Sequence, residues 1–260
     1  MKTLSVVLAA SFLLATHTLV AQETEPITTD RPSTGTGPEL VPTHSLETEN
    51  GVGWTNDDHR SRFDLPESFV RYGINNRIEA RILMPNSHVS GGDPTQSDDI
   101  QFGVKLRLRP EESAWPMAFA TGLSAPSGTG GLSSGAWDPY EAFSVSHHLP
   151  KNFYSFSSIT FASISGAPHG RSLFTQGAVD FGRVVTPHHA VYVEYAPLYD
   201  GRQHTSGYII DGGTIWTVRP NLQLDLRLGH TVVGESSGFN VAIGYSFRRF
   251  VIPPIPNAAR

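Results

Sequence analysis

The feature that most constrains this chain is a repeated alternation of apolar residues with small or polar ones, in runs of strand length. In residues 98 to 109, Ile100, Phe102, Val104, Leu106 and Leu108 alternate with Gln101, Gly103, Lys105, Arg107 and Arg109. Residues two apart in a β-strand lie on the same face, so such a run has one apolar face and one small or polar face. The runs are about nine to eleven residues long, the length of a tilted membrane strand. The sequence therefore predicts an all-β fold.

About twelve such runs follow one another along the chain, an even number such as bacterial outer-membrane barrels use. They cover residues 45–55, 66–75, 77–84, 98–109, 115–123, 139–147, 152–163, 174–184, 191–195, 208–217, 222–228 and 238–247. Short links at 73–76, 110–113, 149–152, 186–188 and 219–221 alternate with longer ones at 56–63, 86–97, 125–137, 165–173, 198–207 and 232–237. This pattern predicts a closed antiparallel transmembrane β-barrel over 44–250, with short periplasmic turns and longer extracellular loops.

The polar faces of the predicted strands favour a barrel over a soluble β-sandwich. Alternation alone is compatible with either fold, since a sandwich also buries one face of each strand. The polar faces, however, mix charges of both signs with glycines such as Gly103, Gly182, Gly229 and Gly244. Small residues beside long charged ones suit a crowded barrel interior. The candidates to line that interior are Arg71, Glu79, Arg81, Lys105, Arg107, Glu194, Asp225 and Arg227.

The two ends of the chain differ from the alternating part. Residues 1–21 have one charge, Lys2, and an apolar run, which predicts a cleaved signal peptide and export. Residues 22–43 are rich in Pro, Thr, Gly and acidic residues and form a predicted periplasmic leader. Asp30 and Arg31 in this leader are candidates to enter the barrel as a plug. Residues 251–260 follow the last strand as a predicted periplasmic tail.

Composition excludes several kinds of function. The chain has no cysteine, which excludes disulfides, thiolate metal sites and cysteine nucleophiles together. Its formal net charge of -5 gives no basic footprint for nucleic acid. No run after the signal peptide approaches the roughly twenty apolar residues of a transmembrane helix. If the protein spans a membrane, it does so with strands.

Several segments resemble a known family. TTDRPS at 28–33, HSLETENGVGW at 44–54, LPESFVRYGINNRIEARI at 65–82, MAFATGLSAPSG at 117–128 and PNLQLDLRLGHTVVGESSGFNVAIGYSFRRF at 220–250 are similar to outer-membrane transporter barrels of the MetA-pathway of phenol degradation family. The resemblance implies a barrel for small solutes, hydrophobic ones included, with no catalytic residues and no cofactor. It also implies outer-membrane lipid and the barrel-assembly machinery as partners. Family members commonly stop at an aromatic residue after an Arg. Here two consecutive arginines, Arg248 and Arg249, precede Phe250, and VIPPIPNAAR follows it.

Three motifs have weaker chemical interpretations. Residues 131–135 fit G-x-S-x-G, but they lie in a Gly/Ser-rich loop without the strand and helix that a nucleophile elbow needs. His147-His148 and His188-His189 each place one ring per strand face, a poor arrangement for a metal site. Asp93, Asp98 and Asp99 form a solvated acidic loop that could bind a divalent cation loosely. We predict neither a metal nor a catalytic site.

The sequence predicts a passive outer-membrane channel rather than an enzyme. Two alternatives stay open. One is a barrel enzyme acting on membrane lipid, which would need a serine beside a histidine on the lipid-facing side of a strand. The other is an exported structural β-protein without transport.

Overall fold

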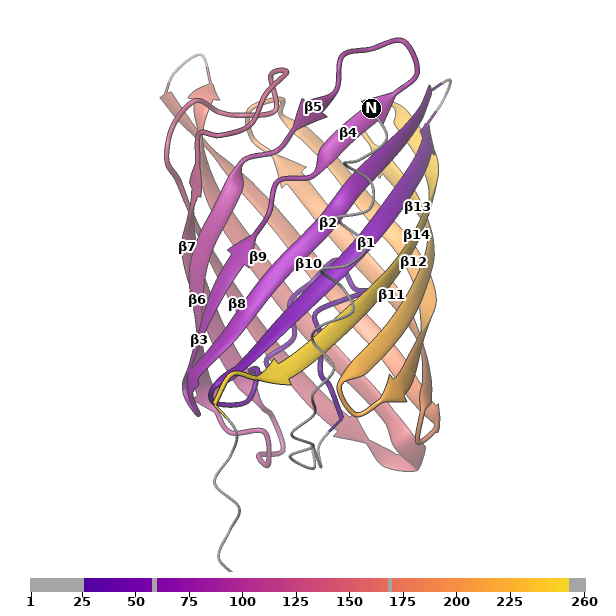
Figure 1. The fold of residues 1–260 in the computed structure, drawn as a ribbon. Helices are drawn as coiled ribbons and strands as arrows, with labels where there is room; N and C mark the ends of the chain where they lie inside the picture. Colours follow the sequence, from indigo (N-terminus) through magenta and orange to yellow (C-terminus); the bar gives the residue numbers. More distant parts are fainter. Residues whose placement is uncertain (1–25, 58–59, 168–169, 253–260) are drawn as a thin grey trace, which may run out of the picture.

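The chain folds into a closed antiparallel β-barrel, as predicted (Figure 1). A computed structural model describes residues 26–57, 60–167 and 170–252. The predicted signal peptide and residues 253–260 of the predicted tail lie outside the described residues. No helix in the described ranges is long and apolar enough to cross a membrane.

Fourteen strand segments make up the barrel wall. They are β1 (Ser45–Asp57), β2 (Arg60–Asn75), β3 (Ile78–Leu83), β4 (Ser87–Ser90), β5 (Gln96–Ser97), β6 (Ile100–Arg109), β7 (Met117–Ala125), β8 (Asp138–Leu149), β9 (Phe153–Ala167), β10 (Gly170–Thr186), β11 (His189–Asp200), β12 (Thr205–Arg219), β13 (Leu222–Val233) and β14 (Ser236–Phe250). A short 3-10 helix, η1 (Pro150–Asn152), joins β8 to β9.

These segments form twelve barrel strands, because two strands are interrupted once each. On β2, Phe69 pairs with Leu83 of β3 and Leu65 pairs with Ser87 of β4, so one register continues from β3 into β4. The same holds for β5 and β6 on the other side of the hairpin. Pro85 lies in the gap, where it has no N–H to donate to a neighbouring strand. The barrel closes where β1 pairs with β14, from Ser45 opposite Phe250 to Asp57 opposite Gly238.

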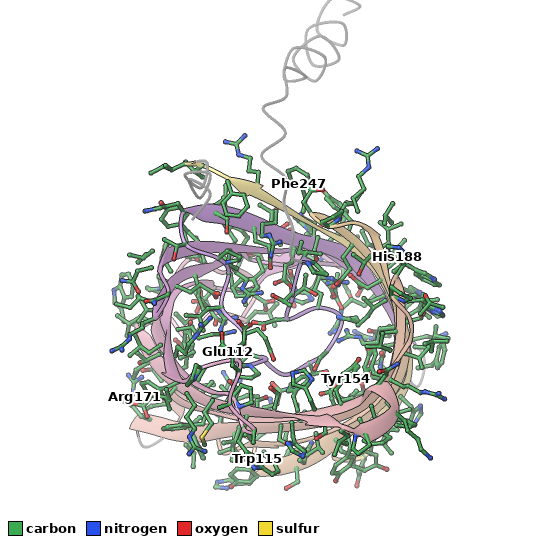
Figure 2. The ribbon with its side chains drawn as sticks, turned by 90° about the horizontal axis from the view of Figure 1, so that it is seen from below. Glu112, Trp115, Tyr154, Arg171, His188 and Phe247 are labelled. Atoms are coloured by element: carbon green, nitrogen blue, oxygen red, sulfur yellow. The ribbon has the colours of Figure 1, made fainter. Side chains whose placement is uncertain are left out.

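The two faces of the wall follow the predicted alternation. On β14, Ile243 and Tyr245 are 59% and 50% exposed, whereas Ala242 and Ser246 are 2% and 0% exposed. Figure 2 looks along the barrel axis and shows Trp115 on the outer side of the wall. A band of exposed apolar side chains around the outside suits lipid, which has no water to solvate polar groups.

The links differ between the two barrel ends. We call the end where β1 begins and β14 ends the turn end, and the opposite end the loop end. Links at the turn end have two or three residues, as predicted, except between β6 and β7, where the link spans 110–116 and is longer than the predicted 110–113. At the loop end, β9, β10 and β12 continue past their predicted limits, so the links there are shorter than predicted. Residues 126–137 remain a long loop, because no strand pairing extends into them apart from the single bridge between Thr129 and Ser97.

The leader enters the barrel from the turn end (Figure 1). The backbone N–H of Ile27 donates to the carbonyl of Pro220 in the β12–β13 turn at 2.7 Å. The leader then crosses the interior and returns to the turn end, where Thr43 bridges Gly73. Leu40 and Val41, two apolar residues of the leader itself, are buried inside the barrel. Residues 26–43 therefore pack as part of the folded barrel.

Candidate functional site in the barrel interior

Arg71 forms the most buried ion-pair cluster in the described residues. It lies on β2 between Glu47 and Glu49 of β1 and Glu79 of β3, and all four residues are 0% exposed. Its Nη1 atom is 3.0 Å from Glu47 Oε1 and 3.0 Å from Glu49 Oε1, and its Nη2 atom is 2.9 Å from Glu79 Oε2. Arg71 also donates to the leader carbonyls of Thr28 and Glu39. The planar guanidinium therefore joins two wall strands to the leader.

Asp30 anchors the leader to the positive side of the interior. Its carboxylate pairs with Arg81 of β3 and lies 3.4 Å from Lys105 Nζ of β6. Burial alone would raise the pKa of Asp30, but the positive charges of Lys105, Arg71 and Arg81 hold that pKa well below its ordinary value. Asp30 is therefore ionised when the leader is in place.

Arg31, the next residue of the leader, anchors it to two other strands of the wall, β2 and β13. It donates to Glu67 of β2 at 2.6 Å and to both carboxylate oxygens of Asp225 of β13, at 3.1 and 3.4 Å. Its guanidinium lies against Gly51 and Gly244, which pair with each other across β1 and β14. A Cβ at either glycine would overlap the guanidinium. These two glycines provide the space that Arg31 occupies.

Residues after Arg31 contact a third part of the wall. The backbone N–H of Thr34 donates to Glu194 of β11, at 3.1 and 3.0 Å from the two carboxylate oxygens. Ser33 Oγ donates to Glu194 and to Asp180 of β10. Gly35 packs so closely on Ser158 and Ala178 that a side chain there would clash. The leader thus contacts the wall on opposite sides of the barrel.

Two cavities lie beside the leader, one toward each end of the barrel. The turn-end cavity, of about 490 Å³, is lined by His148, Tyr154 and Tyr192 among others. The loop-end cavity, of about 590 Å³, is lined by residues such as Tyr140 and Phe174. Leader residues 30–33 line both cavities. Residues 30–33 therefore lie next to both cavities.

The predicted interior residues all occupy the inward-facing positions of their strands. Arg71, Glu79, Arg81, Lys105, Glu194 and Asp225 are buried, and Arg227 is half-buried and donates to the carbonyl of Pro32. Arg107 is set apart from the others, because it lies near the turn end and pairs with Glu111 at 3.6 Å.

Sequence reasoning missed six buried carboxylates: Glu47, Glu49, Asp64, Asp138, Asp180 and Asp211. Glu47 and Glu49 stand on the polar face of a clear alternation, so parity alone could have found them. Asp180 and Asp211 lie in weakly alternating runs. Pairing shows their relation: Asp180 is opposite Glu194, which is opposite Asp211.

The weaker motifs occupy ordinary structural positions. Ser133 of the G-x-S-x-G pattern lies in the loop between β7 and β8 and accepts a hydrogen bond from Gly135. His189 stacks on Trp216, and Asp93 pairs with Arg60 on the exposed loop end. Asp99 accepts hydrogen bonds from the backbone of Ser127 and Gly128. Within the described ranges, no group of three or more potential ligands could hold a metal ion.

One serine does lie beside a histidine on the outer face. Ser155 of β9 is the cross-strand partner of His147 of β8. The His147 ring is stacked on Trp115 with 4.1 Å between ring centroids, and its Nδ1 lies 2.8 Å from the carbonyl of Ala114. Among the described residues, neither His147 nitrogen is hydrogen-bonded to Ser155 Oγ. The pair therefore lacks the contact that activates a serine nucleophile.

Comparison with known proteins gives a family and a fold. The model of the family described as Putative MetA-pathway of phenol degradation matches residues 29–248. No curated protein matches the sequence. The barrel is similar to a COG4313 outer membrane channel from Pseudomonas putida F1, with a TM-score of 0.67 and 13% identity over 81% of this chain and 97% of that one. It is also similar to the NanC porin, with a TM-score of 0.55 and 10% identity over 78% and 98% of the two chains.

Proposed function

Because the chain belongs to the MetA-pathway of phenol degradation family, we propose that it is an outer-membrane channel in which the leader controls passive passage of small solutes. The observation that carries the proposal is the position of residues 30–33 between the two cavities. The exposed apolar band on the outside supports a membrane location. In this orientation the turn end faces the periplasm and the loop end faces the cell exterior.

The loop-end cavity supports small solutes with apolar or aromatic parts as cargo. Apolar side chains such as Phe69, Ile164 and Phe174 line it beside charged ones such as Arg202 and Asp138. Charged and polar side chains make up most of the lining, so a solute in this cavity would need polar groups as well as apolar parts. The family's association with phenol degradation is consistent with such solutes.

Liposome swelling tests this function. Vesicles that contain the purified protein are expected to swell in isotonic solutions of small phenols, sugars or amino acids, faster for smaller solutes, because the barrel interior limits passage by size. Protein-free vesicles provide the baseline. Swelling at the baseline rate for every solute would contradict the proposed channel. It would favour a structural role, because heat-modifiable gel migration can show separately that the barrel is folded.

A further inference from the structure

Three arginines stand near the turn-end limits of alternate strands on one flank of the barrel. They are Arg183 of β10, Arg219 of β12 and Arg249 of β14, and all three are exposed. Arg219 is the last residue of β12 and Arg249 is the last but one of β14, whereas Arg183 lies three residues before the end of β10. We call these three residues the arginine belt.

The arginine belt lies on the outer face of the wall. Cross-strand partners share a face of a sheet, and each belt arginine has an apolar partner. The partners are Phe153 for Arg183, Leu222 for Arg219 and Leu46 for Arg249. On β14, the face that carries Arg249 also carries Tyr245 and Phe247, which are 50% and 40% exposed. The guanidinium groups therefore project from the side that faces lipid.

Aromatic rings on the same face indicate how deep the belt lies in the membrane. The guanidinium of Arg183 lies over the ring of Phe153, with 5.1 Å between its Cζ atom and the ring centroid. Trp216, which is 40% exposed, lies three residues before Arg219 on β12. Aromatic side chains of outer-membrane barrels gather at the level of the lipid headgroups. The belt thus lies at the boundary between acyl chains and headgroups.

The belt arginines have no carboxylate partner, which distinguishes them from the arginines of the loop end. Each of the four loop-end arginines forms an ion pair, with 2.8 to 3.4 Å between the charged atoms: Arg60 with Asp93, Arg62 with Asp64, Arg171 with Asp138 and Arg202 with Asp200. Across the described residues, none of the ion pairs includes an arginine of the belt. The described part of the chain therefore leaves the positive charge of the belt uncompensated.

An anionic lipid headgroup is the partner that fits this arrangement. In the proposed orientation, the turn end lies in the phospholipid leaflet that faces the periplasm. A guanidinium at headgroup depth can donate two parallel hydrogen bonds to a phosphate group while its apolar stem stays among the acyl chains. Anionic lipids attract clustered Lys and Arg residues at a membrane surface. Zwitterionic phospholipids have no net charge and would compensate the belt less.

We propose that the arginine belt is a binding surface for anionic phospholipids, such as phosphatidylglycerol, in the periplasmic leaflet of the outer membrane. The proposal goes beyond the proposed channel function, because the belt lies outside the barrel and its binding requires no solute passage. It rests on the membrane location of the barrel. Bound headgroups would fix the depth of the flank from β10 to β14 in the bilayer.

Lipid-dependent unfolding in detergent tests this binding surface. The midpoint of thermal unfolding is measured by heat-modifiable gel migration, with phosphatidylglycerol or phosphatidylcholine of identical acyl chains added to the micelles. The wild-type midpoint is expected to be higher with phosphatidylglycerol, because a ligand that binds only the folded barrel stabilises it. This difference is expected to shrink as salt is added, since ions screen charges at an exposed surface.

The test variant combines Arg183→Gln, Arg219→Gln and Arg249→Gln, and it is expected to lose the difference between the two lipids. Arg183→Gln alone is expected to reduce the difference, which keeps the test decisive if the triple variant folds poorly. The matched control combines Arg60→Gln, Arg62→Gln and Arg171→Gln at the loop end, and it is expected to keep the difference. Each protein is compared with itself in the two lipids, so a change in its own stability does not affect the result.

Equal wild-type midpoints in the two lipids would overturn the proposal. A difference that survives undiminished in the belt variants, or one that is lost in the loop-end control, would overturn it too, because the lipid contact would then lie elsewhere. A failed swelling assay leaves this test intact, so the binding surface and the proposed channel can fail separately.

Discussion

Deleting residues 23–42 is expected to raise the single-channel conductance severalfold in planar bilayers. Residues 30–33 line both cavities, so their removal joins the two spaces into one continuous path. The wall itself should survive, because its strands pair around the full circumference without help from the leader. Heat-modifiable gel migration of the deletion variant checks that the barrel is folded.

A milder variant separates the leader's anchoring from its presence. Arg31→Ala keeps the leader but removes its bonds to Glu67 and Asp225. We expect more frequent openings than in the wild type, at a conductance close to that of the deletion. Arg60→Ala, which removes an exposed charge at the loop end, is the matched control and should conduct like the wild type. Equal conductance of the wild type and the folded deletion variant would show that the leader does not obstruct the path.

Arg71→Met is expected to give the largest loss of stability of any single substitution in the interior. The change leaves Glu47, Glu49 and Glu79 buried without their shared positive partner. Breaking a buried ion pair by removing one partner costs about 3–5 kcal/mol. The measurement is the free energy of unfolding in detergent, from a urea titration followed by gel migration.

Arg60→Met is the matched control for this loss. Arg60 is mostly exposed and pairs with Asp93 at 3.4 Å, and exposed pairs contribute about 0–1 kcal/mol. Arg71→Lys should lie between the two, because a lysine keeps the charge but cannot reproduce the guanidinium's several directed bonds. If Arg71→Met and Arg60→Met were equally stable, the Arg71 cluster would not hold the wall and the leader together.

The sequence predicts the wall well because the wall depends on a local pattern. Along each strand, residues that face the lipid alternate with residues that face the interior. Ile243 and Ser246 could therefore be assigned to opposite faces from their positions in the alternation alone. The limits of β9 and β10 were less predictable, because the strands extend beyond the apolar band into residues whose pattern is mixed. Pairing between neighbours, rather than side-chain character, sets those limits.

The interior site was less accessible to sequence reasoning because its contacts are distant along the chain. Asp30 and Arg31 stood out as charges in an otherwise irregular leader, but their partners Arg81 and Asp225 follow only from the closed barrel. Asp211 was missed because its run has glycines where an apolar alternation would be expected. One of those glycines, Gly213, leaves space for the Tyr192 ring, which parity alone does not show.

A reversible tether of the leader tests the central claim most directly. The natural chain has no cysteine, so a pair introduced as Gly35→Cys and Ala178→Cys is the only one present. A Cβ at residue 35 would lie 2.6 Å from the Cβ of Ala178, so a small outward shift of the leader reaches the roughly 3.5–4.5 Å of a disulfide. Gly35→Cys alone is the control for the added side chain.

Single-channel conductance is then recorded before and after a reductant is added to the same bilayer. With the disulfide closed, we expect the leader to stay between the two cavities and openings to be rare. After reduction, openings should return to the frequency of the Gly35→Cys control. Frequent openings of the oxidised protein, unchanged by reductant, would contradict the claim that the leader controls the path through the barrel.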